Sequence, residues 1–170
     1  SYRCLERGGI QWPCPTADHP GTPILHREKF ATPSGKGKLV PLSYRPPAET
    51  PDGRYPLVLT TERSIFHYHS TMTRHSPGLD DLRGEEELCL SPEDARRLGI
   101  VDGDLVEVVS RRGRVEVKAR VTRACRPGVV SMSFHFAECP TNTLTSPARD
   151  PVAKIPETKV CAVRVSKISR

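Results

Sequence analysis

Hydrophobic and polar residues alternate most regularly in the second half of the chain. From Arg114 to Thr122, valine and alanine alternate with charged residues, and this period of two predicts a half-buried strand. An uninterrupted run of apolar and β-branched residues over 55–61 predicts a strand that is buried on both faces. Further strands are expected at 87–90, 105–110, 129–134 and 160–168.

One short helix is predicted over 91–98. Ser91 is a good N-cap, Pro92 suits the first helical position, and Asp94 has the spacing of a capping box. Gly99 then provides the left-handed residue at which a helix ends. Residues 62–84 form a long polar loop in this interpretation, and the Arg111–Gly113 turn is a solvated hairpin end.

The N-terminal third has a different character. Prolines crowd into the first 56 positions and the last third of the chain, and 17 are present in total. They predict an extended arm over 1–54, with at most one short strand near 38–42, followed by a compact domain over 55–170. About six strands with one short helix and long loops favour a small closed barrel. The chain also opens without Met or a signal peptide, so it is expected to be a piece of a longer polypeptide.

Charge and cysteine content exclude several classes of protein. The net charge is +6, yet the basic residues are scattered and only 5% of residues are aromatic, which argues against nucleic-acid binding. No apolar run approaches the ~20 residues of a membrane span. The six cysteines contain no Cys-x-x-Cys pair, which disfavours zinc and iron–sulfur sites. Reduced thiols in the cytoplasm are expected.

The loop that follows the 55–61 strand carries the first candidate chemistry. Arginines, hydroxyls and histidines after a strand end could bind a pyrophosphate, although an ordinary solvated loop would have a similar composition. His67, His69 and His75 invite a metal interpretation, but no acidic or cysteine ligand lies near them in the sequence. No metal site is therefore expected, and neutral histidines that hydrogen-bond to a cofactor or to the backbone are favoured.

Several motifs together resemble one known family. They are Leu-Thr-Thr-x-Arg at 59–63, a Ser-Pro-Glu-Asp-Ala helix at 91–100, Gly-Asp at 103–104, Asn-x-Leu-Thr at 142–145 and Asp-Pro at 150–151. In this order they resemble the C-terminal domain of the dimethyl-sulfoxide-reductase family, whose large subunits hold a bis-molybdopterin guanine dinucleotide with molybdenum or tungsten. The arm at 11–15 and 19–26, with 67–74 and 156–165, is similar to formate dehydrogenase large subunits in particular.

The resemblance implies a fold and a role. The fold would be mainly β, a double-psi β-barrel with one or two short helices, preceded by the extended Pro-rich arm. The domain would bind the guanine dinucleotide tails, while the full subunit oxidises formate to carbon dioxide. The resemblance places the catalytic metal ligand and an iron–sulfur cluster in earlier domains, and it implies iron–sulfur electron-transfer subunits as partners. No catalytic residue and no metal ligand is expected within these 170 residues, which alone would be inactive.

The residues expected to bind the cofactor lie on three segments. They are Thr61, Arg63, Ser64, His67, Tyr68, His69, Thr73, Arg74, Phe134, His135, Asn142 and Lys159. Three departures from the family pattern are visible. Glu62 stands where many relatives have Gly, the loop between His69 and Thr71 is shorter than in close relatives, and Thr158 stands where some have an aromatic residue. Two alternatives remain: the same domain from another molybdopterin oxidoreductase such as a nitrate reductase, or a stand-alone barrel binding module.

Overall fold

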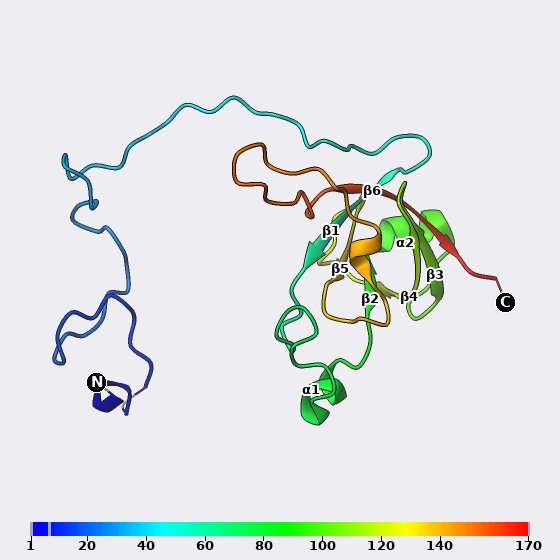
Figure 1. Cartoon of the computed structure of the whole chain (residues 1–170). Helices are drawn as coiled ribbons and strands as arrows, with labels where there is room; N and C mark the ends of the chain where they lie inside the picture. Colours follow the sequence, from blue (N-terminus) through cyan, green and yellow to red (C-terminus); the bar gives the residue numbers. More distant parts are fainter. Residues whose placement is uncertain (1, 7, 170) are drawn as a thin grey trace. The chain divides into compact units, whose positions relative to one another are not determined.

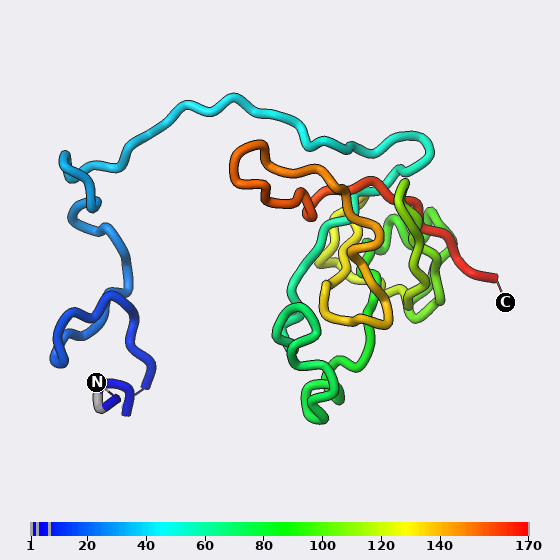
Figure 2. The backbone as a smooth tube through the Cα atoms, in the orientation of Figure 1, coloured from blue at the N-terminus to red at the C-terminus, as the bar shows by residue number. Residues whose placement is uncertain are grey.

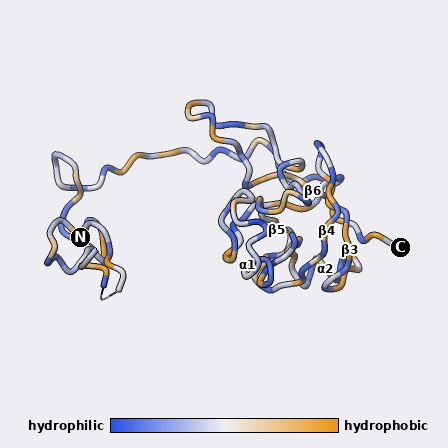
Figure 3. The backbone as a smooth tube through the Cα atoms, turned by 60° about the horizontal axis from the view of Figure 1, so that its bottom comes forward, coloured by the Kyte–Doolittle hydropathy of each residue, from blue (hydrophilic) through white to orange (hydrophobic). Residues whose placement is uncertain are grey.

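The chain forms two compact units, Ser1–Tyr44 and Arg45–Arg170. The structure, a computed structural model, describes residues 2–6 and 8–169. The first unit holds one short 3-10 helix, η1 (Tyr2–Leu5), and turns closed by backbone bonds such as Thr22 N to Gln11 O at 2.9 Å. The expected strand near 38–42 is wrong: these residues are described and contain no strand. Figure 3 shows apolar positions in the segment that joins the two units, and no backbone hydrogen bond to residues 38–42 occurs within the described part of the chain.

The second unit is a closed six-stranded barrel with the strand order β1-β5-β2-β4-β3-β6 (Figure 1). Its elements are β1 (Leu57–Glu62), α1 (Pro77–Leu82), β2 (Glu87–Leu90), α2 (Pro92–Leu98), β3 (Leu105–Val109), β4 (Arg114–Val121), β5 (Val129–Ser133), η2 (Thr141–Thr143) and β6 (Cys161–Lys167). β1 runs parallel to β5 and β2 runs parallel to β4, while the other neighbours are antiparallel. This closed barrel with two parallel crossovers confirms the expected fold class.

The pairing directions divide the loops between two rims. The carboxyl ends of β1, β3 and β5 lie at the same rim as the amino ends of β2, β4 and β6. This rim, called the loop rim below, therefore carries the β1–β2 loop (63–86), the β3–β4 turn (110–113) and the β5–β6 loop (134–160). α2 and the β4–β5 turn lie at the opposite rim. The topology thus brings segments together that are far apart in the sequence.

Apolar side chains from all six strands fill the barrel. Leu59 is 0% exposed, and β4 alternates between exposed and buried positions along its whole length, as its sequence pattern predicts. The other fully enclosed large side chains include Leu57, Leu88, Leu90, Val106, Val108, Val130, Met132 and Val163.

The α2 helix confirms the predicted Ser91 N-cap, and Asp94 contacts the Ser91 hydroxyl. Ser91 Oγ accepts from the Asp94 N–H at 3.0 Å, and Gly99 ends the helix at φ +66°. The Asp94 carboxylate accepts from Ser91 Oγ and from the Gly128 N–H, both at 2.8 Å, and it pairs with Arg97 at 2.7 Å. Burial alone would raise the pKa of Asp94, but these hydrogen bonds outweigh burial and lower it. Asp94 therefore ties α2 to the β4–β5 turn.

Besides η1 in the N-terminal unit, two short helices of the barrel unit were not predicted. α1 lies inside the segment expected to be a loop, and it buries none of its residues, so it carries no hydrophobic period that could reveal it. η2 is a single three-residue turn. None of the helices in the described part of the chain has the length and apolarity that spanning a bilayer would require.

The Arg111–Gly113 turn is solvent-exposed at Arg111 and Arg112, as predicted, but Arg112 is also bonded to another loop. Arg112 Nε and Nη2 donate to the Leu144 carbonyl at 3.0 and 2.9 Å, because the β5–β6 loop folds across this turn. Sequence pattern alone does not show which loop packs over a hairpin end.

Candidate functional site

The loops that follow β1 and β5 lie against each other at the loop rim (Figure 2). Their parallel pairing ends at Glu62 and Ser133, so both chains leave the barrel side by side. The His67 and His135 rings then stack, with centroids 4.0 Å apart and planes 15° apart. The Phe136 ring meets both of them edge-on, at 5.6 and 5.0 Å. This stacked group fixes the two loops to each other.

Hydrogen bonds define the tautomers of the two stacked histidines. His67 Nε2 lies 2.7 Å from the Arg83 carbonyl and must donate to it, because a carbonyl only accepts. In the neutral ring, Nδ1 accepts from the Thr73 hydroxyl at 3.2 Å, and that hydroxyl in turn accepts from the Tyr68 N–H. Both ring nitrogens of His67 are therefore engaged within the chain.

His135 has one buried ring nitrogen without a hydrogen-bond partner in the described protein. Its Nδ1 donates to the Tyr68 carbonyl at 2.9 Å, so Nε2 is an acceptor in the neutral ring. The residue is 1% exposed, and Nε2 has no partner within the described protein. Burial, and next the neighbouring His67, lower the pKa of His135 and favour the neutral form.

Arg74 fastens the same loops by its charge. It pairs with Asp80 at 2.8 Å and with Glu138 at 3.0 Å, and its guanidinium lies 5.3 Å from the centre of the Phe136 ring. These contacts join α1, the β1–β2 loop and the β5–β6 loop. Arg74 and Thr73, both predicted to bind the cofactor, lie in the β1–β2 loop at the loop rim. The side chains of both already have partners within the protein.

The start of β6 adds a second cation. Lys159 Nζ donates to the Thr61 carbonyl, and Thr61 Oγ1 donates to the Thr158 carbonyl at 3.1 Å. Burial lowers the pKa of His69, and the positive charges of Arg63 and Lys159 lower it further. Arg63 and His69 line the same hollow, and Lys159 reaches the chain two residues before Arg63 through its bond to the Thr61 carbonyl. The His69 ring meets Phe134 edge-on at 5.3 Å, and its Nδ1 is buried without a partner in the described protein.

A hollow of about 440 Å³ opens beside these residues. Its lining comes from one continuous stretch of the β1–β2 loop: Arg63, Ser64, His67, Tyr68, His69, Ser70 and Met72. The Ser64 hydroxyl accepts from the Phe66 N–H at 3.3 Å and so shapes this stretch. Asn142 belongs to the same rim but to another loop, where its exposed side chain lies on η2 beside the β3–β4 turn.

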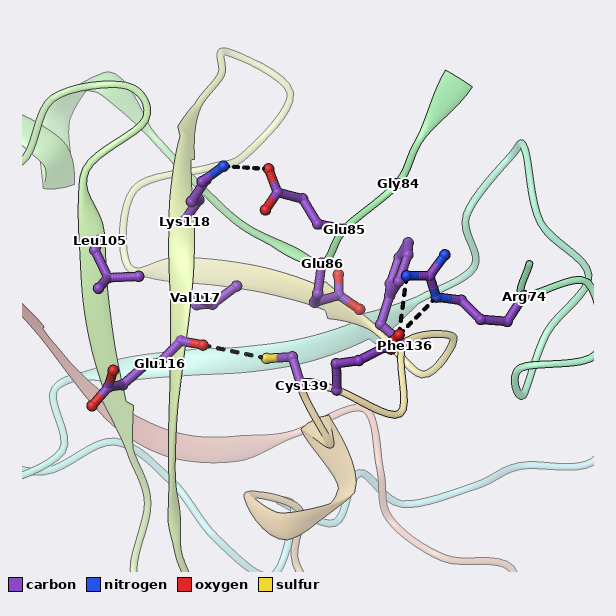
Figure 4. Close-up of a pocket in the computed structure, with 11 residues that line it drawn as sticks. Arg74, Gly84, Glu85, Glu86, Leu105, Glu116, Val117, Lys118, Phe136 and Cys139 are labelled. Carbon is purple, nitrogen blue, oxygen red and sulfur yellow. Dashed lines mark hydrogen bonds and ion pairs between the residues drawn. The ribbon is translucent and has the colours of Figure 1, made fainter. Parts of the chain in front are cut away.

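A second cavity, of about 320 Å³, lies on the barrel wall next to the stacked group (Figure 4). The buried Glu86 lines this cavity. Its carboxylate accepts from the Ser133 and Glu87 N–H groups at 3.1 and 3.2 Å, yet burial has the larger effect and raises the pKa of the carboxyl. Arg83 lies 3.5 Å from Glu86. Sequence reasoning missed this pair, because neither residue stands in a recognisable motif.

The loop rim offers a donor set for an anionic, heterocyclic ligand. Arg63 and Lys159 supply positive charge, while His69 and His135 each hold an unpartnered buried nitrogen. Cations suit phosphate oxygens, and neutral imidazole nitrogens suit the edges of a heterocycle. No group of three or more metal-ligating side chains occurs within residues 2–6 and 8–169. The donor set of the loop rim fits a dinucleotide.

Comparison with known families decides the assignment. Residues 57–162 match the model of the Molydopterin dinucleotide binding domain. The chain belongs to this family. The match covers β1 to the start of β6 and thus all the segments that form the loop rim.

Formate dehydrogenases stand among the relatives of this molybdopterin dinucleotide-binding domain. It is 50% identical over 99% of its length to the F420-dependent formate dehydrogenase subunit alpha of Methanocaldococcus jannaschii, and 51% identical to the F420-dependent formate dehydrogenase 2 subunit alpha of Methanococcus maripaludis. The periplasmic nitrate reductase of Desulfovibrio desulfuricans is 38% identical over 97% of the chain. The chain spans about a quarter of the length of these relatives.

A solved structure supports the fold alone. Acetylene hydratase from Pelobacter acetylenicus superimposes on 67% of this chain and on 18% of its own, with a TM-score of 0.59 and 20% sequence identity.

Proposed function

We propose that this domain holds the guanine dinucleotide tails of a bis-molybdopterin cofactor in a formate dehydrogenase alpha subunit. The observation that carries the proposal is the convergence of two cations at the loop rim, where Arg63 and His69 line one hollow and Lys159 Nζ donates to the carbonyl of nearby Thr61. The relatives at 50% and 51% identity support formate as the substrate of the whole protein, and those at 38% make a nitrate reductase the weaker candidate.

Each available group has a distinct role in this proposal. Arg63 and Lys159 bind phosphate oxygens, because a charge-assisted bond retains its strength where water is excluded. The Asn142 carboxamide offers both a donor and an acceptor to a guanine or pterin edge. His69 and His135 stay neutral and present a nitrogen without introducing a charge. His67, Thr73 and Arg74 hold the loops in place.

The cofactor, when bound, supplies the two-electron chemistry that converts formate to carbon dioxide, at a molybdenum or tungsten centre. The residues of this domain orient the tails and keep water from the phosphates. We place the protein ligand of the metal and an iron–sulfur cluster in other domains of the same polypeptide, electron-transfer subunits at its surface, and the whole in the cytoplasm. A stand-alone binding module is disfavoured, because the relatives carry this region within chains about four times as long.

Guanine nucleotide content tests the proposal. The complete polypeptide that carries this domain is purified, denatured in acid, and the guanine nucleotide released per subunit is measured. Arg63→Ala removes one charge-assisted partner, which is worth about 1.5–3 kcal/mol or roughly ten- to a hundredfold in affinity. The control, Arg114→Ala, changes a side chain that is 78% exposed and lies on β4. Equal content in both variants, under limiting cofactor supply, would reject the proposed rim.

A further inference from the structure

The β3–β4 turn holds the loop that carries Asn142. Arg112 Nε and Nη2 both donate to one carbonyl, that of Leu144, at 3.0 and 2.9 Å. The neighbouring Gly113 leaves no space for a side chain: a Cβ there would overlap the Thr143 methyl group and lie 3.1 Å from the Thr143 carbonyl oxygen. The chain at 143–144 therefore rests directly on this turn.

The segment that precedes β1 holds Arg112 from the other side. Glu49 is largely buried, and its carboxylate pairs with Arg111 and also with Arg112 Nη2 at 2.7 Å. Arg111 also pairs with Asp52 and lies 4.8 Å from the centre of the Tyr55 ring. Because a carboxylate and an aromatic ring orient these two guanidinium groups, the bonds to Leu144 are preorganised.

η2 is held at its two ends by the buried side chains of Thr141 and Leu144, while Asn142 and Thr143 between them are exposed. It is one 3-10 turn, closed by Thr143 N to Pro140 O at 2.9 Å and Leu144 N to Thr141 O at 3.0 Å. Such a turn is too short to be stable alone. The buried Leu144 side chain anchors its end in the core, and Arg112 fixes the orientation of the carbonyl at that end.

We infer that Arg112 is a positioning residue for the cofactor site, which sets the place of the Asn142 carboxamide without contacting the ligand itself. This inference rests on the proposed function of Asn142. The chain of contacts runs from Glu49 to Arg112, then to the Leu144 carbonyl, and so to η2. The planar fork of arginine matters here, since a lysine ammonium cannot reproduce two N–H bonds that converge on one oxygen together with the pair to Glu49.

Binding of GDP to the complete polypeptide, purified without cofactor, tests the inference. Asn142→Ala and Arg112→Met should each weaken GDP binding about three- to tenfold, the size of one neutral hydrogen bond. The double variant should bind no more weakly than either single variant, because both changes remove the same interaction. Arg114→Met, on the same hairpin, should bind as the wild type does.

Amide exchange over residues 140–146 provides a second readout. Exchange at Thr143, Leu144 and Thr145 should accelerate in Arg112→Met and remain unchanged in Asn142→Ala. If Arg112→Met does not fold, Arg112→Lys keeps the charge and Gly113→Ala displaces Thr143 without touching Arg112, and both should lower the affinity for GDP.

The outcomes separate the two hypotheses. Suppose that the wild type binds GDP and Asn142→Ala weakens this binding, while the Arg112 and Gly113 variants leave it unchanged. That result would overturn the positioning role of Arg112 and leave the proposed function standing. If the loss of GDP affinity in the double variant equalled the product of the two single losses, the positioning role of Arg112 would be overturned as well. A wild type that does not bind GDP would reject the proposed function, and the positioning role would fall with it.

Discussion

His67 should act as the central support of the loop rim rather than as a ligand contact. His67→Ala removes the stack on His135, the edge contact with Phe136, and the bonds to Thr73 and to the Arg83 carbonyl. The two ring contacts are worth about 0.5–1.5 kcal/mol each and the two hydrogen bonds about 1 kcal/mol each. Since such terms are not additive, we expect a loss of about 3 kcal/mol in the free energy of unfolding.

Thermal denaturation at pH 8 measures this loss. For a chain of this size, 1 kcal/mol corresponds to about 2–4 °C, so the melting temperature should fall by about 6–12 °C. His67→Phe keeps the ring and loses only the hydrogen bonds, so its loss should be about half as large. The control, His75→Asn, changes an exposed residue of the same loop at φ +67°, a backbone conformation that asparagine tolerates.

One result would refute this account of His67. If His67→Ala had the melting temperature of the wild type and yet lost guanine nucleotide, we would conclude that His67 contacts the cofactor directly. The stack on His135 would then contribute little to the free energy of unfolding.

Three further changes test other parts of the molecule. Arg63→Ala should raise the pKa of His69 toward its ordinary value, although burial, the larger cause, remains; NMR titration should show this, with no change in Arg114→Ala. Asp94→Asn should cost about 2 kcal/mol at neutral pH, measured by urea unfolding. Because the folded-state pKa of Asp94 is lowered, its stabilisation is present above the ordinary carboxyl range and is lost as the pH falls through the folded value, so the variant should differ least from the wild type in acid. Leu59→Ala should cost about 2–5 kcal/mol in thermal unfolding, through the cavity it leaves.

The strands and α2 could be predicted because each carries its own local signal. The alternation from Arg114 onward marks β4, and the Ser91–Asp94 box with Gly99 marks both ends of α2. Lys38–Leu42 carries a similar signal and yet has no strand, because a strand needs a partner and the closed barrel provides no free edge. α1 buries no side chain and so left no pattern to detect.

The site could be predicted only in part, for a related reason. The chain order indicated that Arg63, His69 and Lys159 belong to one site, and the barrel register brings them to one rim. Which of the polar side chains are already bonded to the protein depends on long-range contacts. The pairs that engage Arg74 and Arg112 join segments distant in sequence, and no local pattern encodes them.

The position of β1 in the barrel has a consequence for how the chain folds. Val58 pairs with Val129 on one side and with Ala162 on the other, so the first strand has both of its neighbours late in the sequence. Until β6 has been synthesised, β1 is an apolar strand that lacks one of the two strands with which it pairs. Contacts between such distant residues slow folding, and an unpaired apolar strand invites aggregation. We therefore expect that shortening the chain by the length of β6 leaves an insoluble protein rather than a slightly weaker barrel.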